Sequence, residues 1–369
     1  MAVLLSILAS LIFIGLIAGP VIFLQSRKVL REQKNFERGL KMVPLKIHLP
    51  PPSDDTDVGV RDIRDVTDEN ISKAEILYGI VASTLEKGFR SKFYGQRHLS
   101  FEIIGYKGFI EFYVAVPVRM VDVVKQAVVS AYPNANLEET SDHNIFSKVG
   151  KISSTIGGEL TLKENFAYPI ATYQDIKRDP MQSLLNALST LDKEDGVGIQ
   201  ILIRPAPDDW RKKAAEVAKK KRKGKSEGAF SGMGPLSWFG GVMAALWKPP
   251  ENGSGSDGGE ALSSHEESLV SSIEDKTRKP GFETSIRVVT SSNIAHKSQS
   301  ILNNVVATFA LFDLPGKNGF KYTPAQDIED FVTSYIMRFF PPSHDKNVLS
   351  STELATVFHF PQQNDIPTS

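Results

Sequence analysis

The first 24 residues of this 369-residue chain contain no charged side chain. At 1.5 Å per residue, a helix of this length spans roughly 36 Å, which is enough to cross the ~30 Å hydrocarbon core of a bilayer. A cleaved signal peptide would begin with basic residues and have a shorter apolar core. Residues 1–24 therefore predict an uncleaved transmembrane anchor.

A basic juxtamembrane segment, residues 25–42, follows the anchor and carries Arg27, Lys28, Arg31 and Lys34. No charged side chain precedes the anchor, so the positive-inside rule places the bulk of the chain in the cytoplasm. We therefore expect a single-pass protein of the cell (plasma) membrane. The absence of cysteine excludes disulfides and thiolate metal sites, and a net charge of zero disfavours a whole-chain nucleic-acid binder.

Residues 43–145 have the pattern of a mixed α/β unit. Two β-rich runs flank residues 105–108, and apolar residues alternate with more polar ones between positions 110 and 116. Helical periodicity lies on both sides of this pair, and weaker strand signals lie near residues 43–49 and 135–139. The order strand, helix, strand, strand, helix, strand is typical of a ferredoxin-like sandwich.

The same pattern recurs in residues 157–205 plus 280–322, with Asp179 as the expected helix cap and Pro180 at the first helical position. The predicted fold class is α+β: an N-terminal transmembrane helix followed by two ferredoxin-like (βαββαβ) units. The second unit is split by an insertion at residues 206–279, and residues 323–369 form a C-terminal helix and tail. A mixed α+β domain without duplication is the alternative.

The insertion begins with a strongly basic helix, in which nine cations in residues 211–225 face one acid, Glu216. Such a charge run is typical of a solvated arm, an anionic membrane surface or a nucleic-acid contact, and all three stay open. The candidate residues for anionic lipid or nucleic acid are Arg211, Lys212, Lys219, Lys220, Lys221, Arg222, Lys223 and Lys225.

Residues 228–247 carry no charge and hold two of the three tryptophans. Aromatic side chains in such a segment suit a membrane interface, a partner protein or a packed loop equally well. The candidate membrane or partner contacts are Trp238, Phe239, Met243, Leu246 and Trp247. A disordered Gly/Ser/acid linker, residues 248–261, and a further helix complete the insertion.

No motif for catalysis or cofactor binding is present in the sequence. The G-x-G-x-x-G in the linker lacks the strand and helix that a dinucleotide site needs, and no phosphate-binding P-loop, G-x-S-x-G or H-E-x-x-H occurs. The adjacent pair Asp142-His143 does not indicate a triad, because neighbouring side chains on a strand point to opposite faces. We therefore expect no enzymatic activity, no cofactor and no metal.

Five segments occur in an order that resembles a known family: residues 101–139, 196–214, 279–292, 301–321 and 351–361. The chain is similar to the membrane-anchored region that precedes the motor domain in type IV secretion and conjugation-type ATPases of candidate-phyla bacteria. In such ATPases a piece like Val357-Phe358-His359-Phe360-Pro361 lies shortly before the P-loop domain, whereas this sequence ends eight residues later. The resemblance implies an assembly platform without a motor and transfers no catalytic residue.

Two functional hypotheses follow. The first is a non-catalytic membrane-anchored platform for a type IV secretion or conjugation-like translocation ATPase, acting through protein–protein contacts. The alternative is a membrane-surface or nucleic-acid binding protein that uses the basic arm, residues 211–225. The expected partners are the membrane, a P-loop ATPase or other secretion components; self-association and nucleic acid stay open.

Overall fold

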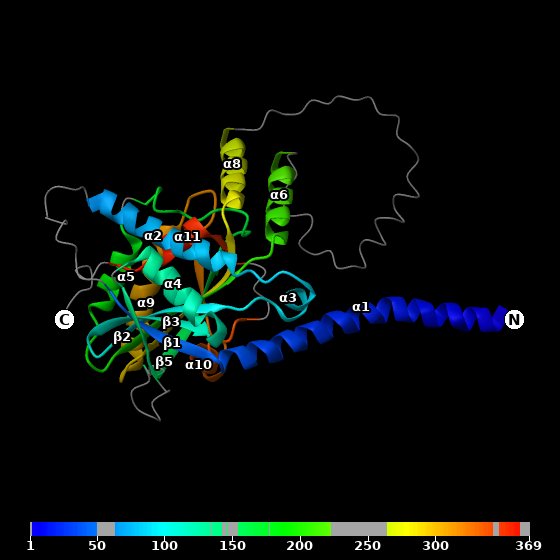
Figure 1. Ribbon diagram of the computed structural model, residues 1–369, viewed down its shortest axis with the longest axis horizontal. Helices are drawn as coiled ribbons and strands as arrows, with labels where there is room; N and C mark the ends of the chain where they lie inside the picture. Colours follow the sequence, from blue (N-terminus) through cyan, green and yellow to red (C-terminus); the bar gives the residue numbers. More distant parts are fainter. Residues whose placement is uncertain are drawn as a thin grey trace.

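The computed structural model describes residues 2–49, 63–133, 135–141, 145, 154–176, 178–222, 264–341 and 347–361. In this part of the chain, nine strands form one sheet in which every pairing is antiparallel, and helices lie against it (Figure 1). The predicted α+β class is therefore confirmed. The strand order is β4-β1-β3-β2-β6-β7-β5-β8, and β9 pairs with β7.

The first half of the sheet contains the four strands of residues 42–139 in the order β4-β1-β3-β2. Its elements are β1 (Met42–His48), α2 (Ile63–Ser83), α3 (Phe89–Tyr94), β2 (Leu99–Tyr106), β3 (Phe109–Pro117), a 3-10 turn η1 (Val118–Met120), α4 (Val121–Ala131) and β4 (Asn136–Glu139). Strands β2 and β3 are joined by a two-residue turn in which Lys107 and Gly108 both have positive φ. This is the turn that matches the twist of a hairpin and for which glycine is well suited.

The second half repeats this arrangement in mirrored order, β6-β7-β5-β8. Its elements are β5 (Thr155–Leu162), α5 (Pro180–Leu188), β6 (Gly196–Pro205), β7 (Gly281–Ser291), α9 (Ala295–Thr308), a 3-10 turn η4 (Phe309–Phe312) and β8 (Phe320–Pro324). The Asp179 side chain accepts hydrogen bonds from the backbone of Met181 and Gln182, so the predicted cap and the Pro180 start of α5 are confirmed.

The two halves meet through β2 and β6, which pair from Leu99 opposite Ile203 to Tyr106 opposite Gly196. They therefore share a continuous sheet rather than forming two separate ones. On one face, side chains of α2, α4, α5, α9 and α11 pack with the strands into a single hydrophobic core. Every residue of the central strand β6 is buried, because the opposite face of the sheet is covered as well.

Helix α10 (Ile328–Ile336) covers the opposite face. Its Val332 and Tyr335 pack against Ile104 of β2 and Val289 of β7. Gly198 of β6 lies directly under the Tyr335 hydroxyl, where a Cβ atom would collide with it. The missing side chain thus allows this helix to lie close to the sheet.

The C-terminal region is more extensive than the helix and tail expected for residues 323–369. After α10 come β9 (Val348–Ser350), which pairs with β7, and α11 (Ser351–Val357). Phe358 and Phe360 are buried in the core, with the Phe358 ring 5.0 Å from that of Phe101 and the Phe360 ring 5.3 Å from that of Tyr132. Phe101 and Tyr132 belong to the first half, so this short apolar stretch ties the two halves together.

Helix α1 (Ala2–Gly39) is continuous through Pro20 and extends away from the body (Figure 1). The division into an anchor and a separate juxtamembrane segment is therefore not visible in the backbone. Among the described residues, no helix combines the length and the apolar character needed to cross a membrane.

Candidate functional site: a charged hairpin, its buried attachment and the docked helix α1

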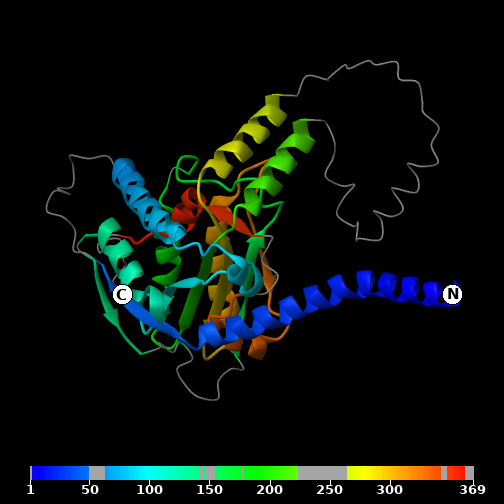
Figure 2. The ribbon, with the colours of Figure 1, turned by 45° about the vertical axis from the view of Figure 1, so that its right-hand side comes forward.

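The described part of the insertion forms two neighbouring helices, α6 (Asp209–Arg222) and α8 (Ser264–Arg278), which project from the body (Figure 2). We call this pair the hairpin. Its seam is apolar: Ala214 and Ala218 of α6 belong to the same buried cluster as Leu269 and Ile273 of α8. Small side chains on α6 allow the two helices to approach closely.

The candidate cations of α6 differ in their surroundings. Lys212, Lys219, Lys220 and Arg222 are exposed, while Arg211 and Lys221 are half-buried. Lys223 and Lys225 lie outside the described residues, as do the candidate contacts Trp238, Phe239, Met243, Leu246 and Trp247.

Helix α8 brings acidic side chains to the basic helix. Arg222 forms an ion pair with Glu274 at 2.6 Å, and α8 also carries Glu266, Glu267 and Asp275. The cations of α6 therefore have an acidic neighbour on α8 in addition to Glu216, the one acid within residues 211–225. The sequence alone did not predict this pairing, because the acids follow α6 by about 50 residues and lie beside it only in the folded hairpin.

The root of the hairpin is attached to the body through both helices, with α6 packed on the sheet and α8 paired with α11. Trp210, at the start of α6, is buried over Gly281, where a Cβ atom would collide with the indole ring. The guanidinium of Arg211 lies over the same indole and donates a hydrogen bond to the carbonyl of Lys279 at 3.2 Å. The first helix of the insertion is thus fixed on the first residue of β7.

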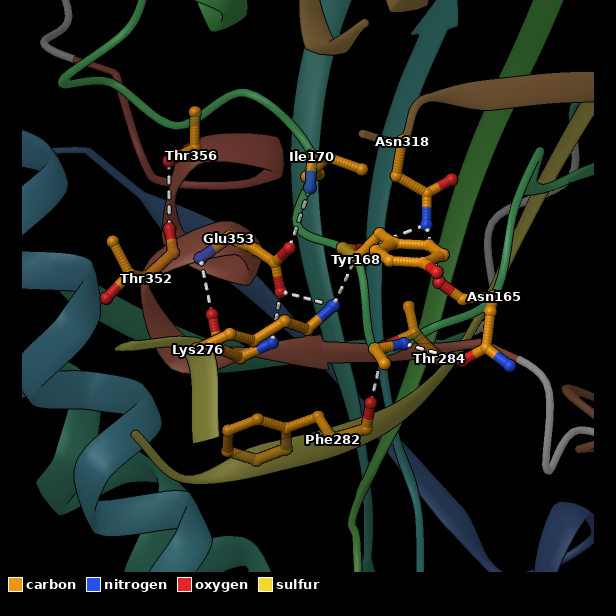
Figure 3. Close-up of polar contacts among 12 residues, drawn as sticks. Asn165, Tyr168, Ile170, Lys276, Phe282, Thr284, Asn318, Thr352, Glu353 and Thr356 are labelled. Carbon is orange, nitrogen blue, oxygen red and sulfur yellow. Dashed lines mark hydrogen bonds and ion pairs between the residues drawn. The ribbon is translucent and has the colours of Figure 1, made fainter. Parts of the chain in front are cut away.

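The second attachment is an ion pair between Lys276 of α8 and Glu353 of α11 (Figure 3). The Lys276 Nζ lies 3.0 Å from Glu353 Oε2, and both side chains are only 1% exposed. Lys276 also donates to the carbonyl of Tyr168 at 3.4 Å. Burial lowers the pKa of Lys276, and the nearby carboxylate of Glu353 opposes this shift.

Both carboxylate oxygens of Glu353 are engaged. One accepts a hydrogen bond from the Ile170 backbone at 2.9 Å, and the other from the Ser350 backbone at 2.7 Å. The Ser350 hydroxyl accepts in turn from the backbone of Glu353, which completes a capping box on α11. The S-x-x-E spacing of Ser350 and Glu353 is a signal from which the start of this helix, though not its ion pair, could have been predicted.

A cavity of about 710 Å³ lies beside this pair, between α2, the loop before α5 and helix α8. Its charged lining is mixed: Lys279 pairs with Glu75 at 3.3 Å, and Asp175 and Lys317 also line it. The ammonium of Lys276 is occupied by Glu353 and Tyr168, so it is poorly placed to act as a nucleophile or base. The arrangement favours holding three segments together over chemistry.

The C-terminal end of α1 is docked on the body by hydrogen bonds to backbone carbonyls. Arg38 donates to the carbonyls of Tyr94 at 3.2 Å, Gly95 at 3.1 Å and Gln96 at 2.9 Å. Asn35 donates to the carbonyl of Phe340 at 3.1 Å. Burial lowers the pKa of Arg38, which lies within the docked region.

A row of polar side chains crosses the sheet beneath this docking region. Glu102, Gln200, Arg287 and Glu159 lie opposite one another on β2, β6, β7 and β5. Gln200 donates to Glu102 at 3.0 Å, and Arg287 donates to Gln200 and to Glu159, each at 3.2 Å. Arg338, just after α10, pairs with Glu102 at 2.7 Å. Glu102, Arg287 and Arg338 are buried and Glu159 is partly exposed, and each buried charge is paired, as burial requires.

His98 lies next to this row. Its Nε2 donates to the carbonyl of Arg338 at 2.7 Å, and its ring is 5.5 Å from that of Phe340. Burial lowers the pKa of His98 to about 3, and the nearby cations Arg204, Arg38 and Arg287 act in the same direction. The imidazole is therefore neutral near pH 7.

In the part of the chain that the structure describes, no group of three or more His, Asp or Glu side chains is arranged to hold a metal ion. A family model described as "Domain of unknown function (DUF8128)" matches residues 48–368. The matched range covers most of the chain and begins at the last residue of β1. None of the curated proteins compared with the chain matches it.

Proposed function

This chain belongs to the DUF8128 family, and we propose that it is a membrane-anchored, non-catalytic platform for a translocation ATPase of the type IV secretion or conjugation type. The platform acts through protein–protein contacts. It sits in the plasma membrane by a single span, with the bulk of the chain in the cytoplasm.

The observation that carries the anchor is the exposed apolar surface of α1. Five large side chains in the part of this helix before Arg27 are between 50% and 68% exposed: Leu16, Val21, Ile22, Phe23 and Leu24. Covering such a side chain is worth about 1.5–3 kcal/mol, so a run of them on a projecting helix indicates a partner that is not water. With the uncharged residues 1–15 before them and Arg27 and Lys28 after them, a bilayer is the partner that the charge pattern favours.

The docking of α1 supports a platform rather than a loose tether. Arg38 and Asn35 hold the helix on backbone carbonyls from two separate segments of the body. This docking supports a fixed orientation of the body relative to the proposed span. A component that positions a large assembly at the membrane needs this property.

We further propose that each half of the sheet is a ferredoxin-like unit and that the two units are an internal duplication. In support, both halves have the order β-α-β-β-α-β, with strand order 4-1-3-2 within each half. The halves share little sequence, so the proposal rests on topology.

The ATPase partner is inferred from the resemblance in segment order. The hairpin is the proposed contact surface, because it projects from the body and is rigidly attached at its root. The absence of turnover by this chain is supported by the Lys276 and Glu353 contacts, which use both groups to hold structure.

Two measurements on cell membranes test this function. Alkaline carbonate extraction should leave the full chain in the membrane, whereas the variant Leu11→Arg/Ile14→Arg, which adds two charges to the span, should be released. A photo-crosslinking residue at exposed Lys213 should capture a protein with a P-loop ATPase domain, and one at exposed Asn303 of α9 should not. Release of the unmodified chain, or equal capture at both sites, would contradict the proposal.

A second candidate function is binding of nucleic acid or an anionic surface by α6, favoured by its exposed lysines. It predicts affinity that falls steeply with salt and is lost in Lys219→Gln/Lys220→Gln/Lys221→Gln. The matched control changes three exposed lysines elsewhere: Lys107→Gln/Lys193→Gln/Lys321→Gln. Equal binding by both triple variants would exclude α6 as the binding surface.

A further inference from the structure

The short helix α3 carries an aromatic cluster that faces away from the core. Phe89 is 75% exposed and its ring stacks on that of Phe93 at 5.8 Å. The Phe93 ring lies 5.6 Å from that of Tyr94 and 5.6 Å from that of Phe23 on α1. Phe23 and Phe93 are 70 residues apart in the chain, so their contact is a product of the fold.

The contacts between the two segments follow a direction along α1. Arg38 binds the carbonyls of Gln96, Gly95 and Tyr94, Arg31 binds the carbonyl of Phe93 at 3.2 Å, and Phe23 touches the Phe93 ring. Contacts closer to the N-terminus of α1 are made with residues closer to the N-terminus of α3. Helix α3 therefore lies alongside α1 and leads toward its apolar end, as Figure 1 also shows.

This position coincides with the end of the apolar stretch of residues 1–24, because Phe23 precedes Leu24 by one residue. If the stretch spans a bilayer, Phe23 lies at the boundary between hydrocarbon and headgroups. Arg27 and Lys28 follow about 6–8 Å further along the helix, at the level of the headgroups. Aromatic rings are enriched at this boundary, and basic residues are attracted to anionic headgroups.

We propose that α3 is a second membrane contact, with Phe89 and Phe93 inserted at the interface of an anionic bilayer beside the end of the span. The inference rests on the proposed anchor and adds a surface that the anchor alone does not require. The chemistry is complementary: aromatic rings for the acyl boundary, and Arg27, Lys28 and exposed Lys87 for phosphate headgroups. The body then lies against the membrane at two points, which limits its tilt.

The chain contains no cysteine, so single labelling sites can be introduced without removing native ones. Three variants of the full chain are compared: Phe89→Cys, Leu11→Cys in the span, and Phe109→Cys as the matched control. Phe109 is 70% exposed and is the first residue of β3, where it pairs with Tyr106 at the end of β2 that is distant from α3. Each variant carries an environment-sensitive fluorophore and is reconstituted in vesicles of phosphatidylcholine with phosphatidylglycerol.

Quenching by nitroxide on the lipid acyl chain near the headgroup, and by iodide in water, locates each label. We expect the Phe89 label to be quenched several-fold more by the lipid nitroxide, and several-fold less by iodide, than the Phe109 label. The Leu11 label should respond to a nitroxide near the bilayer centre. Because Phe89 is largely exposed, its replacement leaves the core of the protein unchanged.

The outcomes separate the inference from the proposed function. A lipid-quenched Leu11 label with a Phe89 label that behaves like Phe109 would overturn the α3 contact and leave the anchor standing. If neither Leu11 nor Phe89 is quenched by lipid, the anchor fails and the α3 contact fails with it. A Phe89 label shielded from both quenchers would mean that protein, such as a second copy of this chain, covers the cluster, and it would also overturn the inference.

Discussion

Helix α1 and the hairpin of α6 and α8 both project from the body, but they present opposite chemistry. The described part of α1 before its basic segment exposes large apolar side chains, whereas α6 exposes lysine and arginine beside the acids of α8. Water solvates the hairpin surface well and the α1 surface poorly. The difference supports the two environments that we propose: a membrane for α1 and an aqueous partner surface for the hairpin.

The two elements are also attached differently. The α1 docking consists of side chains that donate to backbone carbonyls, with Arg38 as its centre. The hairpin is held by a buried indole and by the ion pair of Lys276 and Glu353. The first attachment is a set of hydrogen bonds to neutral backbone groups, while the second contains two buried charges, each of which would be left unpaired if the other were removed.

The largest expected effect is at the hairpin attachment. Lys276→Met leaves the buried Glu353 carboxylate without its cation, and we expect the free energy of unfolding to fall by about 3–5 kcal/mol. Chemical denaturation of the full chain in detergent measures this. Adding Glu353→Gln removes the unpaired charge and keeps one oxygen acceptor, but the amide NH2 replaces the second oxygen, so one of the Ile170 and Ser350 backbone N–H groups loses its acceptor and the double variant should recover only part of the loss. Equal losses in both variants would show that the pair is not the attachment.

The next effect concerns the docking of α1. Arg38→Ala removes the donor from three backbone carbonyls, and we expect a loss of about 2–3 kcal/mol together with faster proteolysis near Lys41. Lys41→Ala is the matched control, because Lys41 is exposed and pairs only with exposed Glu37, so its loss should be below about 0.5 kcal/mol. Equal proteolysis of the two variants would contradict a rigidly docked helix.

Acid should lower the free energy of unfolding through His98, which lies next to the region where α1 is docked. Its pKa is lowered in the folded state from 6.5 to about 3, so the unfolded state binds the proton first. Stability is then fully present above the unfolded pKa and is lost as the pH falls from about 6.5 toward 3. Between pH 7 and pH 5 we expect a loss of about 2 kcal/mol. The variant His98→Gln should lack this component, and a pH dependence identical to that of the wild type would refute the assignment.

The smallest effect is expected on the hairpin surface. Arg222→Ala breaks the pair with Glu274, but both side chains are about half exposed. We expect the free energy of unfolding to change by less than about 0.5 kcal/mol, measured by the same denaturation as for Lys276→Met. A loss comparable to that of Lys276→Met would mean that the hairpin tip contributes to folding, and it would remove the distinction between root and surface.

Local patterns in the sequence were sufficient for much of the fold. Period-two apolar runs predicted strands, and Asp179 before Pro180 predicted the start of α5. The short break at residues 105–108 predicted the turn that joins β2 and β3. These features depend on neighbours within a few residues, so they can be read without knowing the rest of the chain. The order of helices and strands in the two halves could be predicted from the sequence for the same reason.

The contacts that join these elements could not be predicted from the sequence. Lys276 lies in a helix of alternating charge and has the sequence context of a surface residue, but α11 and the loop around Tyr168 bury it. Phe358 and Phe360 gave only a weak signal near the C-terminus, yet they pack on residues that precede them by more than 200 positions. Burial and charge pairing at such distances depend on which surfaces meet, and no local period encodes that.

Of the candidate functional surfaces, one was predicted from the sequence and the others depend on the tertiary structure. The first 24 residues, which carry no charged side chain and lie just before Arg27 and Lys28, predict an anchor from composition alone, because transfer between water and lipid depends mainly on the residues themselves. The ion pair of Arg222 with Glu274, the docking of Arg38 and the placement of Phe93 beside Phe23 arise from contacts between distant segments. These contacts exist only when the sheet brings the segments together, since the position of a side chain in space is set by the whole packed chain and not by its neighbours in sequence.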